Sequence, residues 1–340
     1  LDTFPDFYNL VNRFVSRDIR ETRVLLVACD TDLSVLGRFP NQFEVRSMSY
    51  LDCVGFHHGF SPMQHLQAYG MVGGTPAYQY MIREDPMEAV RKLFLDDMSV
   101  LSLESESLVN GMPLRKVCVK ILSAMATGAD SMRGISTVSG VSQSVCNRVI
   151  NDMENNGLVT KEVAPMNSRN WTCTFYSNIL RFYFSVVAES RMLPDFYTTD
   201  KAYEKAKGLI PGYMEGIFKS VCAEYIRIRC GAKSTMRVRS NSGDVVSDVD
   251  YVATVTDEKG KSRAAMVVCR LNGDPFNLSD LNRMVFRSKA FKSKNVRYMM
   301  FSACGFTDEL KKARLLEGDL VLRTLEEVYE PVPAAEGPSK

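Results

Sequence analysis

The sequence predicts a multidomain chain of mixed α/β and α+β class, on the strength of three stretches. Residues 22–32 include a continuous apolar run of strand length, which is typical of a strand buried on both faces. Residues 112–178 have the periodicity of three amphipathic helices followed by two strands. Residues 213–330 alternate between helical and strand patterns in the order α-β-β-β-α-β-α-β, which favours an α/β sandwich with a mixed sheet. The chain has 340 residues, enough for two or three domains.

Composition places few limits on the partners. The net charge is only +2, so overall charge does not indicate a nucleic acid. No apolar run approaches the ~20 residues of a membrane-spanning helix, so no membrane partner is expected. The nine cysteines include no Cys-x-x-Cys pair, which argues against a zinc ribbon or a disulfide framework and favours a cytoplasmic setting. The chain begins at Leu1 rather than Met, so we expect a piece of a longer protein.

Residues 1–48 contain one predicted helix, at 4–17, and the one predicted strand at 22–32. These two elements cannot form a doubly wound sheet, so most of this domain is expected to lie outside the chain. No Gly-x-x-x-x-Gly-Lys-Ser/Thr sequence, whose backbone would cradle phosphates, occurs in the sequence. We therefore expect this chain to bind no cofactor by itself.

Residues 49–110 have helical patterns and predict a helical lid. Gly73 and Gly74 stand before Thr75 and Pro76, which predicts a turn with the proline in the first turn of the next helix.

Residues 111–180 predict a winged helix-turn-helix, because three helices and a strand hairpin within about 65 residues are fairly specific to that fold. In DNA-binding members of the fold, the third helix enters the major groove and the wing contacts phosphates. The predicted DNA contacts are Gln143, Asn147 and Arg148 on the third helix and Lys161 and Arg169 on the wing. Acidic side chains at positions 152, 154 and 162 weaken this basic character, so self-association or a partner protein is the alternative.

The remaining segments are a linker at 181–212, the α/β sandwich at 213–330 and a disordered, Pro-rich tail at 331–340. The linker is expected to be helical at first and then loop-like.

Two strands of the sandwich resemble the metal-binding strands of PD-(D/E)xK nucleases. Asp250 occupies the position of the aspartate on the first strand, with Asp248 before it, and Glu215 that of the helix glutamate. The resemblance implies that Glu215 and Asp250 hold Mg²⁺. The second strand departs from the pattern: Val268 stands in place of the glutamate and Arg270 in place of the lysine.

Val268 offers no oxygen to a hard cation, and the guanidinium of Arg270 stays protonated and cannot act as a base. We therefore expect a degraded site of Glu215, Asp250 and Arg270 that binds metal weakly. A strand register two residues away and a contribution from Asp274 in the following loop remain open. The aspartates could also be no more than the solvated flank of a hairpin.

Taken together, the helical lid, the winged helix and the nuclease-like sandwich resemble the archaeal-type ATPases with an N-terminal P-loop domain of AAA/STAND type. The sequence GGTPAY at 73–78 is similar to a signature of that family, and VLLVACDTD at 24–32 is similar to its sensor strand. The resemblance implies that the P-loop segments precede Leu1 and that the complete protein binds Mg²⁺ and ATP. It also places Arg38, in the Gly-Arg turn, near the nucleotide of the complete protein.

A second basic cluster follows the sandwich strands. No acidic residue occurs from Leu281 through Thr307, and Arg283 and Arg287 are spaced to share one helix face. The residues of this cluster predicted to contact a phosphate backbone are Arg283, Arg287, Lys292 and Lys294. Phe286 and Phe291 are expected to lie in the core, and a merely solvated helix surface is the alternative.

These expectations combine into one functional hypothesis: the chain is the C-terminal part of an ATPase and acts as a DNA-associated regulatory module with a degraded nuclease-like site. An active metal-dependent nuclease and a protein-interaction scaffold are the two alternatives.

Overall fold

A computed structural model describes residues 7–17, 43, 45–96, 98–164, 167–193, 196–238, 249–256, 262–288, 296–316 and 319–331. The chain divides into two units, Leu1–Glu44 and Val45–Lys340. In the first unit the described element is the predicted N-terminal helix, α1 (Phe7–Arg17). The strand predicted at 22–32 and the nucleotide contact predicted for Arg38 lie outside the described residues.

The second unit begins with a group of short helices, as predicted for residues 49–110. Pro62, Pro76 and Pro86 each stand in the first turn of a helix, where a missing N–H costs nothing. The elements are η1 (Asp52–Phe56), α3 (Pro62–Val72), α4 (Pro76–Met81), α5 (Pro86–Val90), η2 (Arg91–Leu95) and α6 (Val100–Asn110).

The GGTPAY sequence forms a tight joint between α3 and α4. Gly73 ends α3 at φ 67°, a conformation that favours glycine, and its carbonyl accepts a hydrogen bond of 2.6 Å from the buried Gln79 amide. Gly74 lies directly against the backbone of Met48, whose N–H donates to the Gly74 carbonyl at 2.9 Å. A Cβ atom on Gly74 would lie 2.0 Å from the Met48 carbonyl oxygen. Gly73 is therefore required by its backbone conformation, and Gly74 by the close approach of two chain segments.

The three helices and the hairpin predicted after residue 111 are present in the predicted order. They are α7 (Arg115–Ala126), α8 (Met132–Ser139), α9 (Gln143–Asn155), β1 (Val159–Ala164) and β2 (Asn167–Phe175). The hairpin is antiparallel, and Thr172 also forms a bridge with Ser131 just before α8. Val149, Ile150 and Met153 of α9 are buried, so the apolar face of this helix, which was predicted to be amphipathic, packs in the core.

The loop predicted at the end of the 181–212 linker is wrong. After α10 (Asn178–Phe182), η3 (Tyr183–Val187) and α11 (Ala188–Arg191), a single 31-residue helix, α12, runs over Thr199–Arg229. Pro211 lies inside it, and the boundary predicted between linker and sandwich falls in its middle. Proline disfavours a helix interior, but apolar residues recur along one face from Ala202 to Ile226, and their burial outweighs that local cost.

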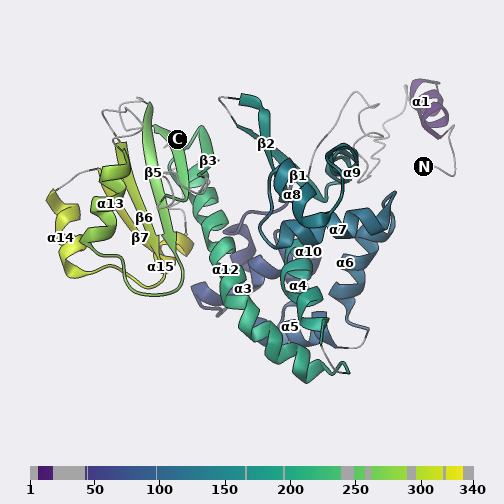
Figure 1. Cartoon of the computed structure of the whole chain (residues 1–340), viewed down its shortest axis with the longest axis horizontal. Coiled ribbons are helices and arrows are strands. Elements are labelled where there is room, and N and C mark those ends of the chain that lie inside the picture. The colour runs from purple at the N-terminus through teal and green to yellow at the C-terminus, as the bar shows by residue number, and fades with distance from the viewer. Residues whose placement is uncertain are drawn as a thin grey trace. The chain divides into compact units, whose positions relative to one another are not determined.

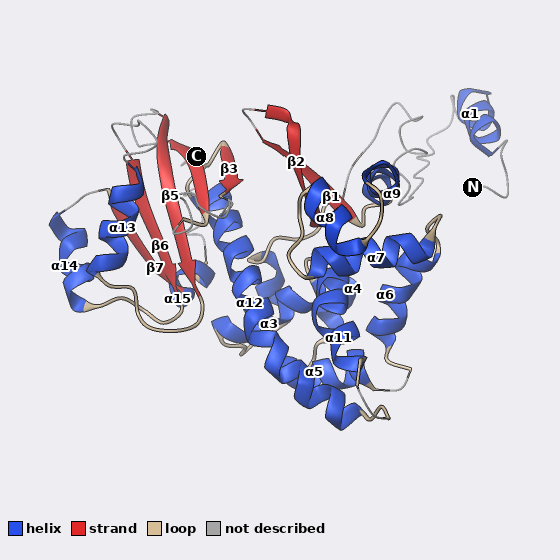
Figure 2. Ribbon diagram, in the orientation of Figure 1, coloured by secondary structure: helices blue, strands red, loops and turns tan. Residues whose placement is uncertain are grey.

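The predicted mixed sheet is present and has the strand order β3-β4-β5-β6-β7. The strands β3, β4 and β5 pair antiparallel, whereas β5, β6 and β7 pair parallel. The strands are β3 (Ser234–Arg237), β4 (Tyr251–Thr256), β5 (Ser262–Arg270), β6 (Val296–Ser302) and β7 (Leu320–Thr324). The helices around them are α13 (Leu278–Ser288), α14 (Asp308–Leu316) and α15 (Leu325–Tyr329), of which α15 was not predicted. Figures 1 and 2 show α12 on one side of this sheet and α13 and α14 on the other.

The two faces of β5 belong to two different cores, and this alternation positions the candidate site. Val267 and Cys269 are buried in the larger core, which includes the apolar face of α12. Met266 is buried in the smaller core with residues of α13, and Val268 packs against the same core. Because side chains alternate along a strand, Val268 and Arg270 share the α13 face of the sheet.

Among the residues that the structure describes, no helix combines the length and the apolar character needed to cross a bilayer.

Candidate functional site

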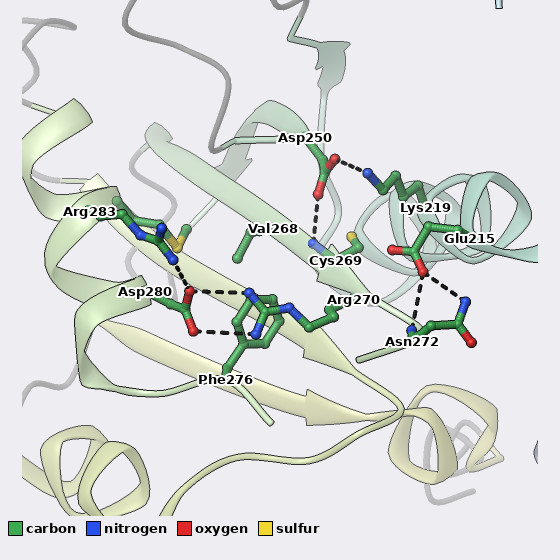
Figure 3. A pocket seen from close by; sticks show the side chains of 11 residues that line it. Glu215, Lys219, Asp250, Val268, Cys269, Arg270, Asn272, Phe276, Asp280 and Arg283 are labelled. Carbon is green, nitrogen blue, oxygen red and sulfur yellow. Dashed lines mark hydrogen bonds and ion pairs between the residues drawn. The ribbon is translucent and has the colours of Figure 1, made fainter. Parts of the chain in front are cut away.

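A cavity of about 290 Å³ opens where β4 and β5 separate, between α12 and α13 (Figure 3). It brings together Glu215, Asp250 and Arg270, the three residues predicted to form the nuclease-like site. The other residues that line it are Lys219, Val268, Cys269, Asn272, Phe276, Asp280, Arg283 and Met284. The position of Asp248 lies outside the described part of the chain.

Asp250 directly precedes β4, and its carboxylate, in place of a backbone carbonyl, accepts a hydrogen bond from a backbone N–H of β5. The Cys269 N–H donates to its Oδ2 at 2.8 Å, and the Lys219 ammonium lies 2.7 Å from its Oδ1. The Asp250 N–H still donates to the Val267 carbonyl at 2.8 Å, so the residue ends the ladder between the two strands. Both oxygens of this carboxylate are therefore engaged by donors of the protein itself.

Glu215 lies on the middle of α12 and reaches the loop that follows β5. One oxygen, Oε2, accepts hydrogen bonds from the N–H groups of Leu271 and Asn272 at 3.1 and 3.2 Å. The same oxygen accepts a third bond, of 3.3 Å, from the Asn272 side chain. Glu215 thus fastens the helix to the end of β5.

Arg270 is held on the opposite side of the cavity by Asp280 of α13. Its two terminal nitrogens lie 3.1 and 3.4 Å from the two Asp280 oxygens, and its guanidinium stacks 3.9 Å from the Phe276 ring centroid. Arg283 also pairs with Asp280, one turn along the same helix. Arg270 is therefore oriented by the Asp280 carboxylate and the Phe276 ring.

Asp280 also completes the N-terminal cap of α13. Its Oδ2 accepts the N–H of Asn277 at 3.0 Å, and the Asn277 side chain in turn accepts the N–H groups of Ser279 and Asp280, the reciprocal pattern of a capping box. Burial by itself would raise the pKa of Asp280, but the hydrogen bonds from Asn277, Arg270 and Arg283 outweigh burial and hold the pKa below its usual value.

The side chains in this cavity do not fit a divalent cation. The strand register places Val268, a hydrocarbon, on the cavity wall between Asp250 and Arg270. Three carboxylates line the cavity, but three basic side chains balance them: Lys219, Arg270 and Arg283. Asp274 is exposed and contributes only its carbonyl, which accepts from Arg270 at 3.1 Å. Across the described ranges, no group of three His, Cys, Asp or Glu residues is placed to bind a metal.

Sequence reasoning missed two of the charged residues in this cavity. Lys219 follows Glu215 by four residues, so helical spacing alone could have placed both on one face of α12. Asp280 follows Asn277 by three residues at the start of α13, which is the spacing of a capping box. No sequence signal indicated that this cap would also bind Arg270.

The residues predicted to contact DNA on the three-helix segment differ in their surroundings. Gln143, Asn147 and Arg148 are exposed along α9. Lys161 is mostly buried: its ammonium lies 2.9 Å from the Glu154 carboxylate, also contacts Asn151, and lies 5.4 Å from the Trp171 ring centroid. The side chain of Arg169 is outside the described part of the structure.

The basic cluster after β5 is described only in its first half. Arg283 and Arg287 lie on α13, whereas Lys292, Lys294 and Phe291 lie outside the described residues. The prediction that Phe286 belongs to the core is wrong, because 64% of its surface is exposed. The core-facing side of α13 is formed instead by Leu281 and Met284, so Phe286 falls on the outer face.

No protein-family model matches the chain, and no curated protein matches it. Three solved structures are similar in part. A repair endonuclease from Pyrococcus abyssi is 15% identical, with 50% of this chain and 66% of that chain covered and a TM-score of 0.23. The protein VC1899 from Vibrio cholerae is 11% identical, with 83% and 59% covered and a TM-score of 0.28. The DNA modification-dependent restriction endonuclease AspBHI is 10% identical, with 52% and 56% covered and a TM-score of 0.22.

This chain spans less than two thirds of the length of each of these three proteins. The class that the fold itself defines is a mixed α+β arrangement with a five-stranded mixed sheet.

Proposed function

We propose that the segment from α12 to α15 is a nuclease-like domain that binds DNA without cutting it. The strongest support comes from the two candidate metal ligands, Asp250 and Glu215, whose carboxylates already bind groups of the protein. Asp250 accepts a backbone hydrogen bond and pairs with Lys219, and Glu215 accepts two backbone hydrogen bonds. A metal ion would have to displace Lys219 from Asp250 and would still lack a carboxylate from the second strand, because position 268 is valine.

The balance of charge in the cavity also argues against metal binding. A cavity that is to bind Mg²⁺ needs an excess of negative charge, whereas the three carboxylates here are matched by three basic side chains. Desolvating a cation in such a neutral cavity brings no electrostatic gain. We therefore assign the network a structural role, as a clamp between α12, β5 and α13.

DNA contact is assigned to the outer face of α13. Arg283 and Arg287 stand four residues apart on this face, and the sequence contains no acidic residue from Leu281 through Thr307. A winged helix formed by α7, α8, α9 and the β1–β2 hairpin is proposed as a second DNA contact, through the exposed Gln143 and Arg148 of α9. Lys161 is less suited to a phosphate because Glu154 already binds it.

In the complete protein, we propose that these two parts act as the DNA-associated regulatory region of an ATPase, for which the GGTPAY joint is the supporting sequence feature. An active nuclease is the second candidate. It is favoured by one observation: the Lys219 ammonium lies 2.7 Å from Asp250 and could replace the lysine that the second strand lacks.

DNA binding and cleavage are tested together. We expect fluorescence anisotropy to show that a labelled duplex binds with an affinity that falls steeply with salt, because released counterions drive phosphate contacts. Arg287→Ala should lower the slope of log K against log salt by about 0.9 for the one phosphate contact removed. The matched control is Lys311→Ala on α14, an exposed lysine outside the proposed face, which should leave the slope unchanged.

The same preparation, incubated with plasmid DNA and Mg²⁺ or Mn²⁺, should leave the plasmid supercoiled. Absence of duplex binding even at low salt would contradict the proposal and favour a protein-interaction scaffold. Nicking that disappears in Lys219→Met would instead support the active nuclease.

A further inference from the structure

The outer face of α13 has an exposed aromatic ring among basic side chains. Phe286 follows Arg283 by three residues and precedes Arg287 by one, and 64% of its surface is accessible. With Asn282, these residues line a second cavity of about 290 Å³. Phe286 belongs to neither hydrophobic core, so its exposed ring is free to contact a ligand in this cavity.

This second cavity adjoins the first, which is lined by Glu215, Asp250 and Arg270. Arg283 lines both of them, and its pairing with Asp280 fixes the guanidinium at their boundary. An arginine has five N–H donors, so a guanidinium bound to one carboxylate keeps donors for a second anion. A chain of phosphates that crosses Arg283 would therefore reach the second cavity, which Phe286 also lines.

We propose that Phe286 is a stacking platform for an unpaired base of single-stranded nucleic acid, with Arg283 and Arg287 holding the phosphates on either side of it. This rests on the proposed function, since it assumes that the domain binds nucleic acid, and adds which form it prefers. Nucleic acid is favoured over a protein partner because positive charge surrounds the ring: the polar residues of this cavity are two arginines and one asparagine.

The size and chemistry of the cavity agree with one nucleotide. Its volume of about 290 Å³ lies just below the ~300–1,000 Å³ range of small-molecule pockets, which suits one base with its sugar. Base stacking on an aromatic ring needs a free face of the base, which a continuous duplex does not offer. The platform should therefore distinguish single strands from duplexes and should tolerate any base sequence.

The test compares binding of a labelled oligothymidine with binding of a labelled duplex, by fluorescence anisotropy on the full chain. Phe286→Ala is expected to weaken oligothymidine binding by about 5- to 150-fold, the range for loss of one stacked base, and to leave duplex binding unchanged. Phe286→Tyr should retain single-strand binding. Leu278→Ala is the matched control, because Leu278 is a partly exposed apolar residue of the same helix that lies outside both cavities.

Phe286→Leu separates stacking from simple apolar contact, and it should behave like Phe286→Ala. Full single-strand binding by Phe286→Ala or by Phe286→Leu overturns the platform while leaving the proposed DNA binding intact. Equal weakening for both oligonucleotides overturns it as well. If the wild type binds neither form, the proposed function itself fails. A wild-type dimer in sedimentation that Phe286→Ala converts to a monomer identifies the face as a self-association surface and overturns the proposal.

Discussion

Gly74→Ala is expected to lower the free energy of unfolding of the Val45–Lys340 unit by about 3 kcal/mol, because the new methyl group has no space. The added Cβ atom would lie 2.0 Å from the Met48 carbonyl oxygen and 2.6 Å from the Met48 nitrogen. Both are backbone atoms, so no side-chain rotation can relieve the clash. The segment around Met48 would have to move and would lose its 2.9 Å hydrogen bond to Gly74.

Gly111→Ala is the matched control for this prediction. Gly111 ends α6 at φ −74°, which any residue adopts, and a Cβ atom there would meet nothing within 4 Å. Its substitution should change the free energy of unfolding by no more than about 0.5 kcal/mol. Urea unfolding followed by circular dichroism measures both variants. Equal urea midpoints for Gly74→Ala and Gly111→Ala would contradict the tight packing of Gly74 against Met48.

Asp280→Ala is expected to cost about 3 kcal/mol or more at neutral pH, because it leaves a partly buried arginine without its partner. The Asp280 side chain is only 7% exposed and binds both Arg270 and Arg283. The substitution also removes one half of the α13 capping box. In contrast, Asp308→Ala at the start of α14 removes a carboxylate that is 89% exposed, and it should cost less than about 1 kcal/mol.

The cost of Asp280→Ala should depend on pH in a defined direction. The pKa of Asp280 is lowered in the folded protein below the ordinary aspartate value of 3.8. Its stabilising contribution is therefore fully present above that value and is lost as the pH falls through the lower, folded pKa. Urea unfolding of wild type and variant at pH 7 and in acid measures this change. The two proteins should converge in acid, and a difference that persists or grows there would contradict the ion-pair network.

Much of the sheet domain was predictable because its elements are bounded by strong local signals. The strand patterns around 251–256 and 262–270 are apolar and separated by polar turns, so their order and pairing follow from the sequence. One cavity brings together Glu215, Asp250 and Arg270, the three residues that the resemblance to nuclease strands had indicated.

The sequence-based predictions that were wrong or incomplete concern features that depend on tertiary contacts. A loop was predicted before residue 212, but α12 continues through Pro211 because its apolar face is buried in the larger core, by contacts that no local window of sequence contains. Phe286 was assigned to the core from its apolar character alone, whereas the pairing of α13 with the sheet selects Leu281 and Met284 instead. The ion pair of Lys219 with Asp250 joins residues from separate elements, which periodicity cannot indicate.

The central claim is that the carboxylates of Asp250 and Glu215 are engaged by the protein's own donors and are not available to a metal. Titration of Mn²⁺ into the full chain, followed by the electron paramagnetic resonance signal of the free ion, tests this most directly. We predict no stoichiometric site at micromolar Mn²⁺, and the same free-ion curve for wild type and Asp250→Asn. One tightly bound Mn²⁺ per chain that is lost in both Asp250→Asn and Glu215→Gln would contradict the account.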